Sequence, residues 1–237
     1  MSRFWAAALA ALVAAAIVAT AAAEDVRTRA EEGPEPGAVQ TARPPIDWLP
    51  SIALGEPFDR GRLVNGVRLP REGTDWTTWD PVLERFPNRP WRRWGTDRLL
   101  RTFLRVARAY RAEHPAAPRL VVGDLSRPHG GEFGRRFGGI GHRSHQNGLD
   151  VDVYYPRLDG AERPPRRVAQ IDSRLAADLV RRFVAARAEF VFVGPNTGLR
   201  GPPRVVQPLA GHDDHLHVRL RNPLPPWMRV NQPSSGS

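Results

Sequence analysis

The segment GHRSHQNGLDVDVYY, residues 141–155, joins a glycine-containing turn to an alternating run that is typical of a β-strand. Successive side chains of a strand point to opposite faces. Asp150 and Asp152 therefore share one face, and Val151 and Val153 share the other. The segment predicts a strand that presents two carboxylates on one side and packs its valines into a core on the other side.

A second segment, HLHVRL at residues 215–220, alternates in the same way. His215 and His217 are expected on one face, and Leu216 and Val218 on the opposite, apolar face. Each segment alone has an ordinary interpretation. A His-x-His pair on a strand is commonly a surface pair, and Asn-Gly with Asp is common in turns. Their occurrence in one chain is what indicates a metal site.

The remaining pattern predicts a mixture of helices and strands. Apolar residues recur at helical spacing over 96–114 and 172–190, and short apolar runs at 119–124 and 190–194 predict strands. Candidate N-caps precede both helices: Thr96 or Asp97, and Asp172 or Ser173. We therefore predict an α+β fold, with a small, mainly antiparallel sheet that carries the metal site and is flanked by helices. His114 ends the first helix before a proline and is expected to be solvated.

The two ends of the chain differ in composition from its middle. Residues 1–23 carry one early arginine and then an uncharged, alanine-rich run, the layout of a signal peptide or of an uncleaved membrane anchor. Either one would place the rest of the chain outside the cytoplasm. Residues 24–45 are rich in Pro, Gly and Glu and predict a disordered linker. We expect one domain over 46–228 and a flexible tail over 229–237.

Composition excludes several kinds of chemistry. The 237 residues include no cysteine and no lysine, so disulfides, thiolate nucleophiles, Schiff-base lysines and Ser-x-x-Lys nucleophiles are all excluded. The net charge of +10 favours anionic partners such as an acidic cell-wall polymer or anionic lipid. Export and the scattering of the arginines argue against nucleic acid. Membrane association is expected only through an uncleaved N-terminal segment.

Two imidazoles and one carboxylate form the ligand set of an open, catalytic zinc site, which keeps one position for water. We select His145, Asp152 and His217 as this set, with one Zn²⁺ per chain. Gly148 allows a tight turn that would return His145 over the start of the strand. His215 would then stand beside the metal, where an imidazole can take or return a proton of the metal-bound water.

These residues also resemble a known family. GHRSHQNGLDVDVYY and GHDDHLHVRL, with VNGVRLP, NRPWRRWGTDRLLRTFL and VVGDLSRPHGG upstream, resemble the penicillin-insensitive murein endopeptidases over about residues 60–221. That family belongs to the zinc peptidase group of lysostaphin-type enzymes, D-Ala-D-Ala peptidases and hedgehog domains. The resemblance implies zinc ligation by His145, Asp152 and His217. It makes His215 the catalytic histidine and His212 a further active-site histidine that stabilises charge on the intermediate.

Further residues are expected around this centre. His142 and Asp150 would support the ligands or act as alternative ligands. The motif VVGDLSRPHGG supplies candidate substrate-binding residues: Ser126, Arg127 and His129. The arginine-rich loop 132–140 is longer than the family pattern, and its Arg135 and Arg136 are expected near the mouth of the cleft. Family members also carry disulfides, which a chain without cysteine cannot form.

The resemblance implies a zinc endopeptidase that hydrolyses D-amino-acid cross-links of peptidoglycan, commonly D-alanyl to meso-diaminopimelyl. Its expected partners are stem peptides and their cross-links, and its expected location is the periplasm or cell envelope of a bacterium. Two alternatives remain. One is a D,D-carboxypeptidase or dipeptidase of the same group, which would remove a terminal D-Ala. The other is a zinc-containing wall-binding module without turnover.

Overall fold

The computed structural model describes residues 45–137 and 143–224. The predicted signal segment 1–23, nearly all of the linker 24–45 and the tail 229–237 lie outside this part. Within the described residues, no helix combines the length and the apolar character that crossing a membrane requires.

Both predicted helices form, and both begin at predicted caps. Helix α2 spans Asp97–Glu113, and the hydroxyl of Thr96 accepts a hydrogen bond from the backbone N–H of Leu99 at 3.1 Å. Helix α3 spans Ser173–Ala185, and the carboxylate of Asp172 accepts from the N–H of Leu175 at 3.0 Å. Helix α3 is shorter than the predicted 172–190.

The early end of α3 has a tertiary cause. Arg187 adopts a φ of 61°, which reverses the chain just after the helix. The next residues then form strand β8, Ala188–Val193, which pairs with β10, His215–Leu220. Pairing and burial of Val191 and Val193 therefore override the helical propensity of this stretch.

The central sheet has six strands in the order β4-β6-β7-β10-β8-β9. Its members are β4 (Trp76–Thr78), β6 (Leu120–Val122), β7 (Asp150–Tyr154), β8, β9 (Val206–Pro208) and β10 (His215–Leu220). The three inner pairings are antiparallel, which confirms the mainly antiparallel prediction. The two edge pairings, β4 with β6 and β8 with β9, are parallel. The first of these follows a crossover through α2, as a parallel pair requires.

Two small sheets and three short 3-10 helices complete the described structure. Strands β1 and β2 form one antiparallel ribbon, and β3 and β5 form another. Their bounds are Ile52–Glu56, Asp59–Val64, Val67–Arg68 and Trp94–Gly95. The 3-10 helices are η1 (Pro90–Arg92), η2 (Arg135–Phe137) and η3 (Val168–Gln170).

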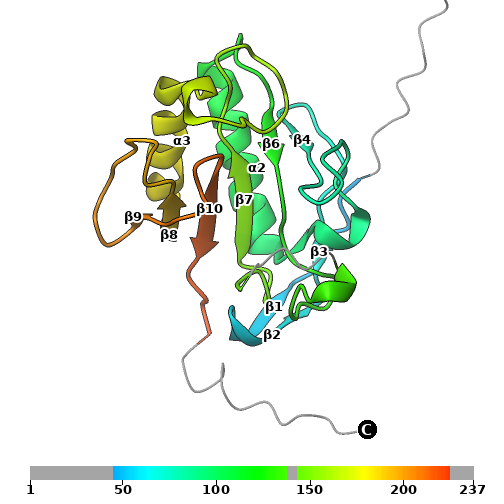
Figure 1. The fold of residues 1–237 in the computed structure, drawn as a ribbon. Coiled ribbons are helices and arrows are strands. Elements are labelled where there is room, and N and C mark those ends of the chain that lie inside the picture. Colours follow the sequence, from blue (N-terminus) through cyan, green and yellow to red (C-terminus); the bar gives the residue numbers. More distant parts are fainter. Residues whose placement is uncertain (1–44, 138–142, 225–237) are drawn as a thin grey trace, which may run out of the picture. The chain divides into compact units, whose positions relative to one another are not determined.

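The two faces of the central sheet have different roles. Figure 1 shows α2 and α3 together on one side of the sheet, α2 behind β7. Their apolar faces form a single buried core with Val151, Val153, Leu216 and Val218. The opposite face of the same two strands carries their aspartates and histidines. The alternation seen in the sequence thus separates a hydrophobic face from a polar one.

Candidate metal centre

The pairing of β7 with β10 places the polar residues of the two strands opposite one another. In this antiparallel ladder Asp152 is the partner of His217, and Asp150 is the partner of Arg219. Direct partners have side chains on the same face, with Cβ atoms about 4.5–5.5 Å apart. The register therefore brings a carboxylate and an imidazole from distant parts of the sequence into contact.

The turn before β7 returns a third side chain to this position. Gly148 has a φ of 76°, and a Cβ there would lie 2.8 Å from the side chain of Leu63. Only glycine fits this backbone without strain. His145 itself has a φ of 68° and is completely buried. The turn places its imidazole against the polar face of β7.

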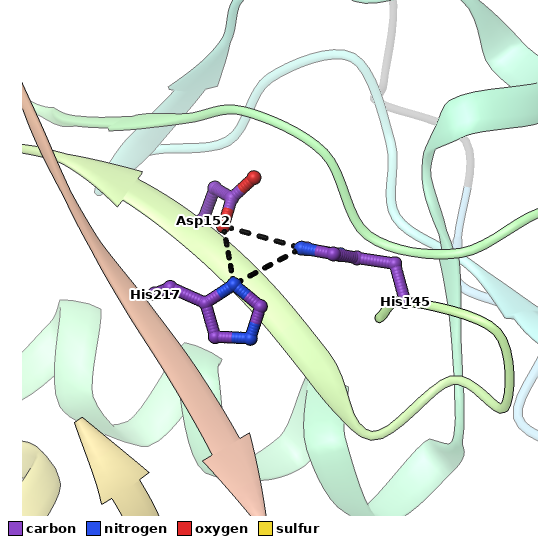
Figure 2. A group of neighbouring side chains, drawn as sticks. All are labelled: His145, Asp152 and His217. Atoms are coloured by element: carbon purple, nitrogen blue, oxygen red, sulfur yellow. Dashed lines mark hydrogen bonds and ion pairs between the residues drawn. The ribbon is translucent and has the colours of Figure 1, made fainter. Parts of the chain in front are cut away.

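The three side chains point toward one another from the turn, β7 and β10 (Figure 2). His145 Nε2 lies 3.2 Å from His217 Nδ1 and 3.3 Å from Asp152 Oδ1. His217 Nδ1 lies 3.2 Å from the same carboxylate oxygen. All three residues are buried. The structure therefore gathers the three residues that the sequence selected as a ligand set.

The other nitrogen of each imidazole is held by an acceptor, which fixes the tautomer. Nδ1 of His145 lies 2.8 Å from the carbonyl oxygen of Leu125, so this nitrogen donates. Nε2 of His217 lies 2.8 Å from Oδ1 of Asp150, so it donates there. The nitrogens that face Asp152 are then left with lone pairs in the neutral rings. Each histidine is oriented as metal-binding histidines usually are.

This donor set fits a cation. Two imidazole nitrogens and a carboxylate oxygen are all acceptors, and a positive ion between them would satisfy all three. Ligands of a tetrahedral site at about 2.0–2.1 Å from the ion are about 3.3–3.4 Å apart. The observed separations of 3.2–3.3 Å match that spacing closely. The group could hold a metal ion without rearrangement.

The ion pairs around the cluster shift its protonation equilibria. Burial alone would lower the pKa of His217, but hydrogen bonds to Asp150 and Asp152 raise it to about 9. Burial alone would raise the pKa of Asp152, but His145 and His215 hold it well below its usual range. Without a metal, the ring of His217 therefore carries a second proton at neutral pH and is positively charged. This second proton must leave when a metal binds.

Asp150 contacts the ring nitrogen of His217 that does not face Asp152. Its Oδ1 accepts from Nε2 of His217 and from Nε of Arg219, both at 2.8 Å. Burial would raise the pKa of Asp150, but Arg219 and His217 keep it far below its ordinary value. Asp150 is thus a carboxylate that orients His217, in the place where we expected a supporting group or an alternative ligand. His142 lies outside the described residues.

Two further histidines line the edge of the cluster. Nε2 of His215 lies 3.7 Å from Oδ1 of Asp152, and its Nδ1 lies 2.6 Å from Oδ1 of Asp214. The ring of His212 stacks obliquely on that of His215, with centroids 4.7 Å apart. Burial, followed by the proximity of His215, lowers the pKa of His212. Both residues are partly exposed, so a substrate can reach this edge.

The predicted substrate-binding residues make their described contacts outside the cluster. Ser126 is fully buried, and its backbone bridges to Trp94. Arg127 donates to the carbonyl of Glu132 and stacks on Phe137, with its guanidinium carbon 3.7 Å from the ring centroid. The side chain of His129 is exposed. Within the described residues, none of these contacts is with the three clustered side chains, and their role in substrate binding stays a prediction.

The start of the arginine-rich loop covers one side of the cluster. Phe133 is buried and meets the ring of His145 edge-on, at 6.5 Å between centroids. It also packs against Trp91, with 6.0 Å between centroids. Arg135 and Arg136 lie on η2 and are exposed. The loop thus provides both an apolar wall for His145 and a basic outer surface.

Sequence reasoning missed several supporting residues. Asp214 and Arg219 were not singled out, although one directly precedes His215 and the other follows His217 by two positions, on the same strand face. It also missed a buried ion pair between Arg92 and Asp124. The backbone carbonyl of Asp124 accepts from the N–H of Asp152 at 2.9 Å, so this buried pair helps to hold β7 in position.

A second cluster of one histidine and two carboxylates comprises His114, Glu113 and Asp178. Here the prediction that His114 is solvated is wrong. Its side chain is 12% exposed, and its Nε2 lies 2.9 Å from Asp178 Oδ2 because α3 packs alongside α2. Arg182 donates to both acidic residues, at 2.6 Å in each case. This group is an interhelical ion-pair network whose carboxylates are already neutralised.

The sequence matches a peptidase family. Residues 53–191 match the family described as penicillin-insensitive murein endopeptidase, which is well over half of the 237 residues. The match includes His145 and Asp152 and ends before β10, which carries His217.

Three similar proteins carry the same name, penicillin-insensitive murein endopeptidase. The one from Yersinia enterocolitica is 28% identical over 207 residues, covering 76% of this chain and 69% of that protein. The one from Salmonella heidelberg is 31% identical over 153 residues, covering 53% of each. The one from Pectobacterium atrosepticum is 26% identical over 208 residues, covering 77% and 71%. The matched segment, which includes two of the three clustered residues, shows that this chain belongs to the penicillin-insensitive murein endopeptidase family.

Proposed function

We propose that this protein is a zinc metallo-endopeptidase that hydrolyses D-amino-acid-containing cross-links of peptidoglycan. The observation that carries the proposal is the cluster of three acceptor atoms, 3.2–3.3 Å apart, on His145, Asp152 and His217. Family membership supports the choice of peptidoglycan, because the relatives are named as murein endopeptidases.

Zinc is the proposed ion because of the donor set. Two imidazoles and one carboxylate at tetrahedral spacing suit Zn²⁺ and leave a fourth position open. Calcium and magnesium prefer sites made mainly of oxygen ligands. When bound, zinc would supply Lewis-acid polarisation of the scissile carbonyl and a water molecule of lowered pKa.

His215 is the proposed proton carrier. Its Nδ1 faces Asp214, so the carboxylate holds the ring with Nε2 on the side of the cluster. An imidazole in this position takes a proton from the attacking water at Nε2 and returns it to the leaving amine. The charge of Asp214 stabilises the imidazolium that exists between these two transfers.

His212 is the proposed stabiliser of negative charge at the reacting carbonyl. Its Nδ1 donates to the carbonyl oxygen of Ala210 at 3.1 Å, which leaves Nε2 to face the substrate. Nε2 can donate only when the ring is protonated. Because burial and His215 lower the pKa of His212, this role needs the developing negative charge of the substrate to favour protonation.

The same proposal assigns a role to each segment of the chain. Residues 1–23 would direct export, or anchor the chain if they are not cleaved. Residues 24–45 would act as a tether, 46–228 as the peptidase domain and 229–237 as a flexible tail. The enzyme would then act in the periplasm or cell envelope, where its partners are stem peptides and their cross-links.

The test is incubation of the purified protein with peptidoglycan sacculi, with and without a chelator, followed by mass analysis of the products. Cleaved cross-links and new free amines, lost with chelator and restored by Zn²⁺, are expected. Release of terminal D-Ala alone would identify a carboxypeptidase instead. Retention on sacculi without any product would identify a binding module and overturn the proposal.

A further inference from the structure

A groove of about 820 Å³ opens beside the edge of the metal centre that carries His215. Tyr154 and Asp214 line it at this end. Both touch His215: the ring of Tyr154 lies 5.8 Å from that of the histidine, and Asp214 holds its Nδ1. The remainder of the wall comes largely from residues 163–170, in the connection between β7 and α3 (Figure 1). A ligand in this groove would therefore extend from the reacting centre.

Four arginines line the groove, and two of them are engaged within the protein. Arg157 pairs with Asp159 and also donates to Gln170 Oε1 at 3.1 Å. Arg166 lies 3.4 Å from Glu84 in an exposed pair. The other two are Arg163 and Arg167. Their side chains are exposed, and within the described part of the chain neither makes a hydrogen bond or a salt bridge, although the pKa of Asp159 is lowered by its hydrogen bond to Arg157 and, more weakly, by the charge of Arg163.

The acidic residues of the groove are already bound. Asp213 accepts from the side chain of Asn196 at 2.6 Å and from its backbone N–H at 3.1 Å. Asp214 is committed to His215. Among the described charged side chains of the groove, the two that make no hydrogen bond or salt bridge are therefore both arginines, Arg163 and Arg167.

The segment that presents these arginines is constrained by prolines and by hydrogen bonds. Pro164 and Pro165 stand between them and fix two φ angles. The carboxamide oxygen of Gln170 accepts from the backbone N–H of Arg166 at 2.7 Å and from Arg157 at 3.1 Å. Because the backbone is held in place, binding a ligand costs little ordering entropy there.

We propose that the groove binds an anionic peptide, and that Arg163 and Arg167 recognise its free carboxylates. This inference deepens the proposed function and rests on it: the occupant is the stem peptide on one side of the scissile cross-link. Stem peptides contain acidic residues whose carboxylates are not all consumed in amide bonds. Arginine is suited to such groups because its planar guanidinium binds a carboxylate with two hydrogen bonds.

The first test is direct binding of a soluble stem tetrapeptide to the full chain. Two forms are compared, one with all carboxylates free and one with the carboxylates converted to amides. We expect the free form to bind about tenfold more tightly, through two exposed arginine–carboxylate contacts. Its affinity is expected to fall with rising salt, whereas that of the amide form is not. Equal binding of the two forms would overturn the inference.

The second test uses the double variant Arg163→Ala/Arg167→Ala. The matched control is Arg108→Ala/Arg174→Ala, which removes the same charge from exposed positions on α2 and α3 outside the groove. We expect the groove variant to lose the preference for the free form and to show about a tenfold higher KM on soluble cross-linked muropeptides with kcat retained. The control is expected to behave as wild type, and an equal loss in both variants would indicate a general charge effect and overturn the inference.

These tests separate this inference from the proposed function. If sacculi are hydrolysed but carboxylates make no difference to binding, the groove assignment fails and the endopeptidase proposal stands. If the peptide binds through its carboxylates but no substrate is cleaved, the groove binds an anionic peptide as inferred and the endopeptidase proposal fails.

Discussion

Asp152 of β7 and His217 of β10 are direct partners across an antiparallel ladder, although 65 positions separate them in the sequence. Their contact depends on register alone. A slip of one residue would move one of the two side chains to the face that packs against the helices. The valines and leucines between the polar residues prevent such a slip, because it would expose them. The hydrophobic core thereby fixes the geometry of the candidate metal centre.

Replacing His217 or His215 should separate metal binding from catalysis. His217→Ala removes one of the three converging acceptors, so metal content and activity should be lost together. His215→Ala leaves all three in place, so metal content should persist while turnover falls by about 10²–10⁴. Elemental analysis after dialysis and muropeptide product analysis measure the two effects. Near wild-type turnover in His215→Ala would show that its role is assigned wrongly.

Asp150→Asn tests the carboxylate behind His217. The substitution keeps the shape of the side chain but removes the negative charge that orients and polarises the imidazole. Metal affinity should fall by about 10–100-fold, as measured by competition with a chromophoric chelator. Asp59→Asn, the same change at an exposed position at the start of β2, is the control. Similar affinities in the two variants would contradict a supporting role for Asp150.

The polar faces that carry Asp152 and His217 were predictable because both strands alternate. Period-two patterning assigned Asp152 and His217 to polar faces, and the turn residues Asn147 and Gly148 indicated a return of the chain before β7. Whether the two strands pair, and in which register, is a tertiary property that periodicity does not contain. That the two segments meet was a hypothesis based on their ligand-type residues, and the family resemblance implied the same three ligands without giving the register. The α+β class and both helix starts followed from local patterns.

Long-range partners were not predictable. Nothing local indicates that α3 will bring Asp178 to His114, or that Arg92 will be completely buried against Asp124. The parallel edge strands are equally non-local, because their pairing depends on where the crossover ends. The groove beside His215 is lined by a connection whose sequence, rich in arginine and proline, resembles an ordinary loop.

Asp214 is predicted to position His215. Asp214→Ala removes the acceptor for Nδ1, so the ring can rotate away from the cluster. We expect kcat to fall by about 10–100-fold with metal content unchanged. Asp214→Asn retains an acceptor oxygen and should restore part of this loss. If Asp214→Ala raised KM and left kcat intact, the residue would act on binding in the groove and not on the histidine.

The network around Asp178 should make stability depend on pH in the acidic range. Burial alone would raise the pKa of this carboxyl, but hydrogen bonds from Arg182 and His114 outweigh it and lower the pKa below the ordinary 3.8. A carboxyl with a lowered pKa in the folded state binds protons more weakly than in the unfolded chain. Its stabilisation is therefore complete above the ordinary pKa and is lost as the pH falls through the lowered value.

Asp178→Ala isolates this contribution. At neutral pH the variant should be about 2–3 kcal/mol less stable, because Arg182 and His114 lose their buried acceptor. The difference between wild type and variant should shrink as the pH falls from the ordinary pKa of 3.8, where the carboxyl of the unfolded chain is protonated, through the lowered pKa, where that of the folded protein is protonated too. Urea unfolding followed by circular dichroism at a series of pH values measures it, and Asp59→Ala serves as an exposed control. A difference that stays constant from neutral to strongly acidic pH would mean that the charge of Asp178 contributes nothing to the contact between α2 and α3.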